Sequence, residues 1–365
     1  MKSKFKIFVD CHVFDGSFQG TTTYLKGVYT EMIKNNNFEF FFASNNIEII
    51  TEIFGIQSNV KYLQYYSNNK FYRLLIDIPK LIKKYKIDYA HFQYIVPPIK
   101  NCKYINTIHD VLFLEYPEYF PLTYRIKNKI LFKWSAKKSD IVLTVSEFSK
   151  QSIQKHFNIQ NIQITPNAVD PVYFERYNKI EIKRQVKLQY DIDNYWLYTS
   201  RWEPRKNHHT LLQVFVENNY YKKYSLVFIG DKAIENEKYN DYFSPLSPEI
   251  KAKILTLNKV DFLELLLLLR GADLFIYPSF AEGFGIPPLE AVAAGIPTVC
   301  SNTTAMASFN CIENNFFDPH SKQDMATVIQ KTILEEMDSL KSINLKSNYN
   351  WSHSATVLTN QIDKT

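Results

Sequence analysis

The sequence predicts an α/β protein with two doubly wound domains, each built on a parallel sheet. Short apolar runs with the length of buried strands alternate with amphipathic runs with the length of helices. The alternation breaks after Asn167, where AVDPVYFERYN has no periodicity, and it resumes at Trp196. A chain of 365 residues also fits two domains of ordinary size. We therefore expect domains at 1–170 and 171–350, followed by a terminal helix at 351–365.

The first half is expected to contain six strands and four helices. The strands are expected at Phe5–Phe14, Phe38–Ala43, Tyr89–Phe92, Tyr104–Ile108, Ile141–Val145 and Ile162–Thr165. The helices are expected at Thr22–Lys34, Arg73–Lys86, Thr123–Lys137 and Phe148–Phe157. Such an order indicates βαβ units on a parallel sheet, whose ligands bind at the carboxyl ends of the strands.

The second half repeats the pattern. Strands are expected at Trp196–Ser200, Leu226–Gly230, Ile254–Leu257, Leu274–Tyr277 and Thr298–Cys300. Helices are expected near Asn207–Glu217, Asp261–Arg270, Pro288–Ala294 and Asp324–Leu340. A nicotinamide dehydrogenase is disfavoured, because no Gly-x-Gly-x-x-Gly motif follows the first strand of either half.

Composition and charge limit the partners and the compartment. The four cysteines are scattered without ligand spacing, which favours a reducing cytoplasm and no structural metal. No run approaches the roughly 20 apolar residues of a membrane span. The net charge of +6 is uneven: residues 1–170 hold 22 Lys and Arg against 14 Asp and Glu. A basic first half indicates an anionic surface or ligand on that side, and we expect no nucleic-acid partner.

The most informative stretch is YPSFAEGFGIPPLEAVAAGIPT at 277–298. A buried strand leads into a loop containing Gly283, Phe284 and Gly285, and a helix is expected to begin near the two prolines that follow. Its unpaired N–H groups form an anion site. Glu282 in the loop and Glu290 in the expected first turn bracket this site. Because carboxylates do not bind anions, sugar hydroxyls are their expected partners; the alternative is a tight turn with a capping carboxylate.

EGFGIPPLEAVAAGIPTV resembles the signature of family 4 of the retaining glycosyltransferases, also called glycosyl transferases group 1. The resemblance implies a GT-B fold, with two Rossmann-like domains facing a central cleft and a final helix that crosses back to the first domain. It also implies that Glu282 contacts the donor sugar and that Glu290 holds the nucleotide ribose. The donor-binding set then includes the backbone of Gly283, Phe284 and Gly285.

Other candidate residues follow strands of the first half. Gly20 precedes a helix, where either a plain turn or a phosphate contact explains a glycine. His109 ends a strand, and TIHDVLFLEYPEYF resembles the family segment whose histidine meets the donor sugar. A structural histidine is the alternative. Asp110 is expected to orient His109 or to cap the next turn, and Ser146 to cap a helix or to lie near the acceptor.

The second half offers two cations and a second strand end for the donor. Arg201 and Lys206 lie in SRWEPRKN at the end of the first strand, where fixed cations suit a diphosphate. A surface-exposed basic loop is the alternative, and Arg205 is expected to point away. Gly230 and Asp231 close the next strand and are expected to border the nucleotide base. We expect Lys206→Ala to lower turnover with little change in thermal stability.

The segment 121–139, PLTYRIKNKILFKWSAKKS, contains six basic residues and no acidic one. Leu122, Ile126, Ile130 and Trp134 recur at intervals of four, which predicts a helix with an apolar face between cationic flanks. That face can pack on its own sheet, or it can rest on an anionic bilayer. Both alternatives stay open at this point.

The implied function is a retaining, metal-independent glycosyltransferase. It would move a hexosyl group, mannosyl favoured, from a nucleotide diphosphate sugar to a saccharide or lipid-linked saccharide in surface polysaccharide synthesis. The expected location is the cytoplasm, at the inner face of the membrane if the basic helix binds lipid. No cofactor is expected, since Asp191 and Asp193, the single Asp-x-Asp, read as a loop. A nucleotide-sugar epimerase and a silent sugar-nucleotide-binding subunit are the alternatives.

Overall fold

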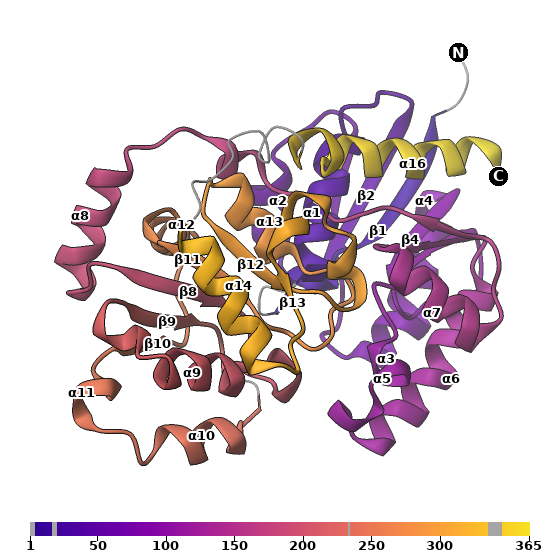
Figure 1. Cartoon of the computed structure of the whole chain (residues 1–365). Helices are drawn as coiled ribbons and strands as arrows, with labels where there is room; N and C mark the ends of the chain where they lie inside the picture. Colours follow the sequence, from indigo (N-terminus) through magenta and orange to yellow (C-terminus); the bar gives the residue numbers. More distant parts are fainter. Residues whose placement is uncertain (1–3, 17–19, 233, 335–344) are drawn as a thin grey trace. The chain divides into compact units, whose positions relative to one another are not determined.

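The computed structural model describes residues 4–16, 20–232, 234–334 and 345–365. Its contacts divide the chain into two compact units (Figure 1). Unit 1 comprises residues 1–168 and 349–365, and unit 2 comprises residues 169–348. The expected helix at Asp324–Leu340 falls partly outside the described residues. No described helix combines the length and the apolar character needed to cross a bilayer.

Unit 1 is built on a seven-stranded parallel sheet in the order β3-β2-β1-β4-β5-β6-β7. The strands are β1 (Phe5–Asp10), β2 (Phe38–Ser44), β3 (Val60–Gln64), β4 (Tyr89–Gln93), β5 (Lys103–Thr107), β6 (Ile141–Thr144) and β7 (Ile162–Ile164). The α-helices are α1 (Gly20–Met32), α2 (Ile47–Phe54), α3 (Lys70–Tyr72), α4 (Ile78–Tyr85), α5 (Leu112–Glu115), α6 (Leu122–Lys138), α7 (Glu147–Phe157) and α16 (Trp351–Lys364). Shorter elements are η1 (His12–Phe14), the π-helical turn η2 (Arg73–Asp77) and η3 (Pro117–Tyr119).

Unit 2 is built on a six-stranded parallel sheet in the order β10-β9-β8-β11-β12-β13. The strands are β8 (Tyr195–Thr199), β9 (Ser225–Ile229), β10 (Ile254–Leu257), β11 (Leu274–Tyr277), β12 (Thr298–Ser301) and β13 (Phe316–Phe317). The α-helices are α8 (Lys179–Tyr190), α9 (His208–Glu217), α10 (Glu237–Phe243), α11 (Pro248–Lys251), α12 (Phe262–Gly271), α13 (Ile286–Ala293) and α14 (Lys322–Leu334). Short helical turns are η4 (Pro171–Phe174), η5 (Pro204–Lys206), η6 (Tyr220–Lys222), η7 (Thr304–Ser308) and η8 (Asn310–Asn315).

Each strand order reverses once, which positions the ligand-binding edge of each sheet. The reversal lies between β1 and β4 in unit 1 and between β8 and β11 in unit 2. Ligands of doubly wound sheets bind outside the carboxyl ends of the strands at such a switch point. The predicted doubly wound α/β class is therefore confirmed for both units.

The last helix, α16, belongs to the same unit as the start of the chain. Figure 1 shows α16 in yellow beside the indigo elements, and α16 packs along α1. Ser354 Oγ donates to Pro166 O at 2.7 Å, and Tyr89 Oη donates to Ile362 O at 3.0 Å. Residues more than 180 positions apart in sequence thus share one core.

Candidate active site

The candidate site lies in unit 2, at the switch point between β8 and β11. The loops that follow these strands are joined by a hydrogen bond from Phe280 N to Arg205 O at 2.8 Å. Asn207 Nδ2 donates to Pro278 O at 3.1 Å and to Pro319 O at 3.0 Å. Asn207 immediately precedes α9, but its side chain makes no cap hydrogen bond and instead donates to these two backbone carbonyls.

Glu282 is the centre of a buried charge cluster. Its Oε1 accepts from Lys206 Nζ at 2.5 Å and from Tyr277 Oη at 3.0 Å. Its Oε2 accepts from Arg205 Nη1 at 3.1 Å. Burial alone would raise the pKa of Glu282, but the charges of Lys206 and Arg205 outweigh burial and lower it to about 2. The Glu282 side chain is therefore a carboxylate held by two cations at neutral pH.

One feature of this cluster differs from the sequence-based prediction. Arg205 was predicted to point away, and this is wrong: its guanidinium also donates to Ala281 O at 2.8 Å. The short helix η5 turns Arg205 and Lys206 toward the same loop. Arg201 is the more exposed cation, with 53% of its side chain accessible and its Nη1 3.7 Å from Glu203 Oε1. Glu203 Oε2 lies 2.9 Å from Arg205 Nε, so Arg201 is linked to the cluster through Glu203.

The glycine loop adopts the conformation that its glycines allow. Gly285 has φ +94° and immediately precedes α13, and a Cβ there would lie 3.1 Å from Met306 Cγ. Gly283 and Phe284 are buried beside it. Glu282 N donates to Thr304 Oγ1 at 3.0 Å, so the segment after β12 supports this loop. Thr304 lies in a segment, SNTTAMASFNC at 301–311, from which no contact with this loop was predicted.

Glu290 lies deeper in the helix than expected. It is the fifth residue of α13, so its predicted place in the first turn is wrong. Burial raises its pKa to about 7; a hydrogen bond from Tyr173 opposes the rise and the charge of Asp170 adds to it. Tyr173 comes from η4, at the start of unit 2, where the sequence shows no periodicity. Sequence reasoning therefore missed this partner.

Gly230 and Asp231 follow β9, next to the β8 loop. A Cβ on Gly230 would lie 1.9 Å from Ser200 O, and its φ is +150°, so only glycine allows this approach. Trp202 N donates to Asp231 O at 2.9 Å, while the Asp231 side chain is exposed. The strand-end loops that carry Arg201 and Asp231 are thus held together through their backbones.

His109 lies at the carboxyl end of β5 in unit 1 and is 6% exposed. Its Nε2 donates to Gln93 Oε1 at 2.6 Å, and the Tyr24 ring packs edge-on at 5.0 Å. Burial lowers the pKa of His109 to about 3, so the ring is neutral at physiological pH with Nδ1 as an acceptor. Gly20 begins α1, and a Cβ there would meet no atom within 4 Å. Packing therefore does not require glycine at position 20.

The remaining predicted positions show local roles. Asp110 Oδ1 accepts from Leu112 N at 3.1 Å, and Ser146 Oγ accepts from Ser149 N at 3.0 Å, so each caps the following turn. Asp191 and Asp193 both pair with Lys187 in an exposed loop. Within the described ranges, no three His, Cys, Asp or Glu side chains are grouped to hold a metal ion.

The apolar face that the sequence predicts for α6 does not pack on the sheet of unit 1. Leu122, Ile126 and Ile130 are 62%, 54% and 64% exposed. The buried face consists of Asn128, Phe132, Ser135 and Ala136. The first alternative, packing of the apolar face on the sheet, is therefore wrong.

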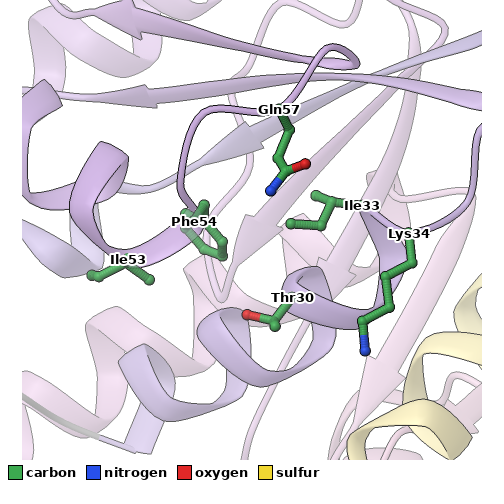
Figure 2. A pocket seen from close by; sticks show the side chains of 6 residues that line it. All are labelled: Thr30, Ile33, Lys34, Ile53, Phe54 and Gln57. Atoms are coloured by element: carbon green, nitrogen blue, oxygen red, sulfur yellow. The ribbon is translucent and has the colours of Figure 1, made fainter.

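A surface hollow on unit 1 is a separate feature (Figure 2). It is lined by Thr30, Ile33, Lys34, Ile53, Phe54 and Gln57. The hollow lies where α1 and α2 end, whereas the candidate residues lie at the carboxyl ends of strands. It contains none of them.

Comparison with known proteins identifies the family. The model "Glycosyl transferases group 1" matches residues 179–348, and the model "Glycosyltransferase Family 4" matches residues 37–173. The chain belongs to the group 1 glycosyltransferases of family 4. This confirms the resemblance of the 282–299 segment, and the fold of this glycosyltransferase is GT-B.

Individual relatives of this glycosyltransferase are moderately similar. O-antigen chain mannosyltransferase B of Escherichia coli is 28% identical over 302 residues, covering 76% of the chain and 78% of the relative. O-antigen chain mannosyltransferase RfbU of Salmonella typhimurium is 32% identical over 204 residues, covering 54% of the chain and 51% of the relative. The structure of Anabaena Alr3699/HepE in complex with UDP-glucose matches with a TM-score of 0.73 at 14% identity, covering 99% of each chain.

Proposed function

We propose that this glycosyltransferase moves a hexosyl group, in the first instance mannosyl, from a nucleotide diphosphate sugar to a saccharide acceptor during surface polysaccharide synthesis. The observation that carries the proposal is the buried cluster of Lys206, Arg205 and Glu282 beside the start of α13. Cations at one sheet edge, together with the loop N–H groups that precede Pro287 and Pro288, suit a diphosphate. The mannosyltransferase names of the relatives favour mannose as the sugar.

The cluster suits stabilisation of a departing nucleoside diphosphate. As the donor bond breaks, negative charge grows on the diphosphate and positive charge grows on the sugar ring. Arg201 is exposed, and among the described residues its ion pair is a long contact with Glu203, so its guanidinium can turn toward the diphosphate. Lys206 is already oriented by Glu282 and needs little reorganisation. Loss of one such charge-stabilising contact typically costs about 3 kcal/mol in the transition state.

We propose retention of anomeric configuration without a divalent cation. In this mechanism the departing phosphate accepts the proton of the acceptor hydroxyl, so no separate base is needed. Glu282 is a carboxylate that accepts hydrogen bonds from Lys206, Tyr277 and Arg205. Ser279 is a further donor to it, so a sugar hydroxyl would take the place of one of these donors. Glu290 and the Glu282 loop would hold the ribose and the sugar.

A panel of GDP-, UDP- and dTDP-sugars tests the donor. The matching donor should raise the unfolding temperature, and Lys206→Ala should abolish the rise. Nucleotide release should then require a saccharide acceptor. Release without an acceptor would favour an epimerase or hydrolase, and donor binding without any turnover would favour a silent binding subunit.

We further propose that the acceptor is lipid-linked and that α6 holds the enzyme at an anionic bilayer on the cytoplasmic side. The exposed ridge of Leu122, Ile126, Ile130 and Trp134 can enter the interface, while the lysines of α6 meet lipid phosphates. Each cation near such a surface contributes about 1 kcal/mol. Charge complementarity therefore favours an anionic lipid surface over a neutral one.

Vesicle co-sedimentation tests this docking. The protein should sediment with phosphatidylglycerol vesicles and remain in solution with phosphatidylcholine vesicles. The double variant Ile126→Asp with Ile130→Asp should lose this binding. Ile180→Asp on α8 is the matched control, because Ile180 is also highly exposed, at 83%, but lies in unit 2. Equal sedimentation with both lipids, or an equal effect of the control, would contradict the proposal.

A further inference from the structure

A cluster of polar side chains, centred on the buried Asp10, lies at the carboxyl end of β1 in unit 1. Asp10, the last residue of β1, is 1% exposed. Its Oδ1 accepts from Tyr65 Oη at 2.8 Å and from His12 N at 3.3 Å. Its Oδ2 lies 3.1 Å from His12 Nδ1. The Asp10 carboxylate is therefore well supplied with partners at the switch point of the sheet.

Arg73 faces this carboxylate but makes few interactions. Its side chain is only 9% exposed, and Nη2 lies 3.7 Å from Asp10 Oδ2. The Tyr65 ring lies 5.9 Å from the guanidinium carbon. Within the described ranges the guanidinium donates no hydrogen bond, and Nε is buried without a partner. A buried donor without an acceptor is costly, so the unpaired Nε of Arg73 indicates that a ligand supplies an acceptor here.

The backbone around Arg73 fixes its position. Arg73 begins the π-helical turn η2, a local geometry that is frequent at functional sites. Asp77, at the other end of η2, accepts from Tyr66 N at 3.0 Å and from Ser67 N at 3.3 Å. The loop after β3 and the turn that carries Arg73 are therefore tied to each other.

The surroundings of Arg73 are electropositive. Lys70 precedes it on α3, and burial together with the charges of Arg73 and Lys127 lowers the pKa of Lys70. Lys127 lies on α6, so this cluster adjoins the basic surface proposed to meet lipid. Among the described residues, Asp10 is the carboxylate that acts on both Arg73 and Lys70, so its single charge offsets part of theirs.

We propose that Arg73 and Lys70 form an oxyanion subsite that binds a phosphate group of a diphosphate-linked acceptor. A planar guanidinium with unused donors matches the geometry of phosphate oxygens, and Lys70 supplies a second charge. Asp10 and Tyr65 orient the guanidinium. When no phosphate is bound, the Asp10 carboxylate offsets part of the positive charge of Arg73 and Lys70. This subsite rests on the proposed transfer to a lipid-linked acceptor and supplies its recognition element.

Site-resolved acylation of lysines tests the subsite without requiring turnover. The full-length protein is treated with an amine-reactive ester in inorganic pyrophosphate or in KCl of equal ionic strength, and each lysine is followed by peptide mass spectrometry. At twice the dissociation constant, pyrophosphate should slow acylation of Lys70 about threefold. Lys322, which pairs with Glu217 in unit 2, is the control and should not respond.

Variants separate this subsite from the donor site. Arg73→Gln should remove the protection of Lys70, and Arg73→Lys, which keeps a cation beside Asp10 and so preserves folding, should weaken it. Lys206→Ala should leave the protection of Lys70 unchanged. A loss of protection in the wild type would therefore contradict the acceptor subsite without contradicting the donor assignment.

Other ligands test the source of the phosphate. Farnesyl diphosphate should protect Lys70 like pyrophosphate, whereas phosphatidylglycerol vesicles should protect the α6 lysines. Protection by KCl equal to that by pyrophosphate, or protection of Lys70 by vesicles alone, would overturn the proposal.

Discussion

Lys206 is both a cation proposed to stabilise the transition state and a partner of the buried Glu282 carboxylate, so one substitution tests both roles. Its ammonium is buried against Glu282, so Lys206→Ala removes a transition-state cation and one partner of a buried carboxylate. Turnover should fall at least about tenfold. The sequence predicted little change in stability, but Lys206 is buried, so the unfolding free energy should fall. The loss should be limited to about 1–3 kcal/mol, because Arg205 still holds Glu282. Steady-state kinetics and thermal unfolding measure the two effects.

The matched control for Lys206→Ala is Lys322→Ala. Lys322 also forms an ion pair, with Glu217 at 2.8 Å, but both side chains are nearly half exposed. Exposed pairs contribute about 0–1 kcal/mol, so this variant should change neither quantity appreciably. Wild-type turnover in Lys206→Ala would contradict the assignment.

Glu290 should make stability depend on pH near neutrality. Its pKa is raised to about 7 from an ordinary value of 4.5, mainly by burial. The folded chain therefore binds a proton between these values that the unfolded chain does not, and this contribution is lost as the pH rises from about 4.5 to about 7. Between pH 5 and pH 8, wild type should lose up to about 3 kcal/mol relative to Glu290→Gln. Chemical unfolding at both pH values measures the difference, and parallel pH profiles would refute it.

At the carboxyl ends of β8 and β9 in unit 2, Gly230 allows the backbones of two loops to approach each other closely. Gly230→Ala would place a Cβ 1.9 Å from Ser200 O at a φ of +150°, so the loops after β8 and β9 must separate. We expect a loss of stability of about 1–3 kcal/mol and weaker donor binding, since Arg201 follows Ser200. Gly20→Ala at the start of α1 is the control, because its Cβ meets nothing. Equal unfolding temperatures of the two variants would contradict this reading.

The buried strands were the easiest elements to predict from sequence. Strands such as β6 and β11 are buried throughout, so they appear as short, nearly continuous apolar runs. The sequence did not reveal β3, an edge strand whose polar residues remain exposed, or the helix α2 that precedes it. Edge strands bury little, and their pattern is therefore weak.

At the scale of the whole molecule, the two-unit architecture was more predictable than the site. The order of strands and helices follows from local periodicity, whereas the charge cluster joins segments near 205, 282 and 304. Glu282 and Lys206 were identified because they lie at strand ends within recognisable motifs. Arg205, Tyr173 and Thr304 became partners only through tertiary packing, which single-sequence patterns do not encode.

The closure of unit 1 by the chain's last helix gives a prediction about two distant residues. A Cβ on Gly27 of α1 would lie 2.1 Å from the Trp351 indole of α16. Gly27→Ala alone should therefore destabilise unit 1 by about 1–3 kcal/mol through overpacking. Trp351→Ala alone should cost about 3–5 kcal/mol through the cavity it leaves.

Combining the two substitutions distinguishes direct packing from unrelated losses. In the Trp351→Ala background the added methyl group enters vacated space, and alanine favours the helix by about 1 kcal/mol over glycine. Gly27→Ala should then be neutral or stabilising, so the double variant is more stable than the sum of the single losses predicts. Calorimetric unfolding of the four proteins measures this coupling. Additive losses would show that α16 does not seat on Gly27 in solution, and closure of unit 1 by the terminal helix would have to be abandoned.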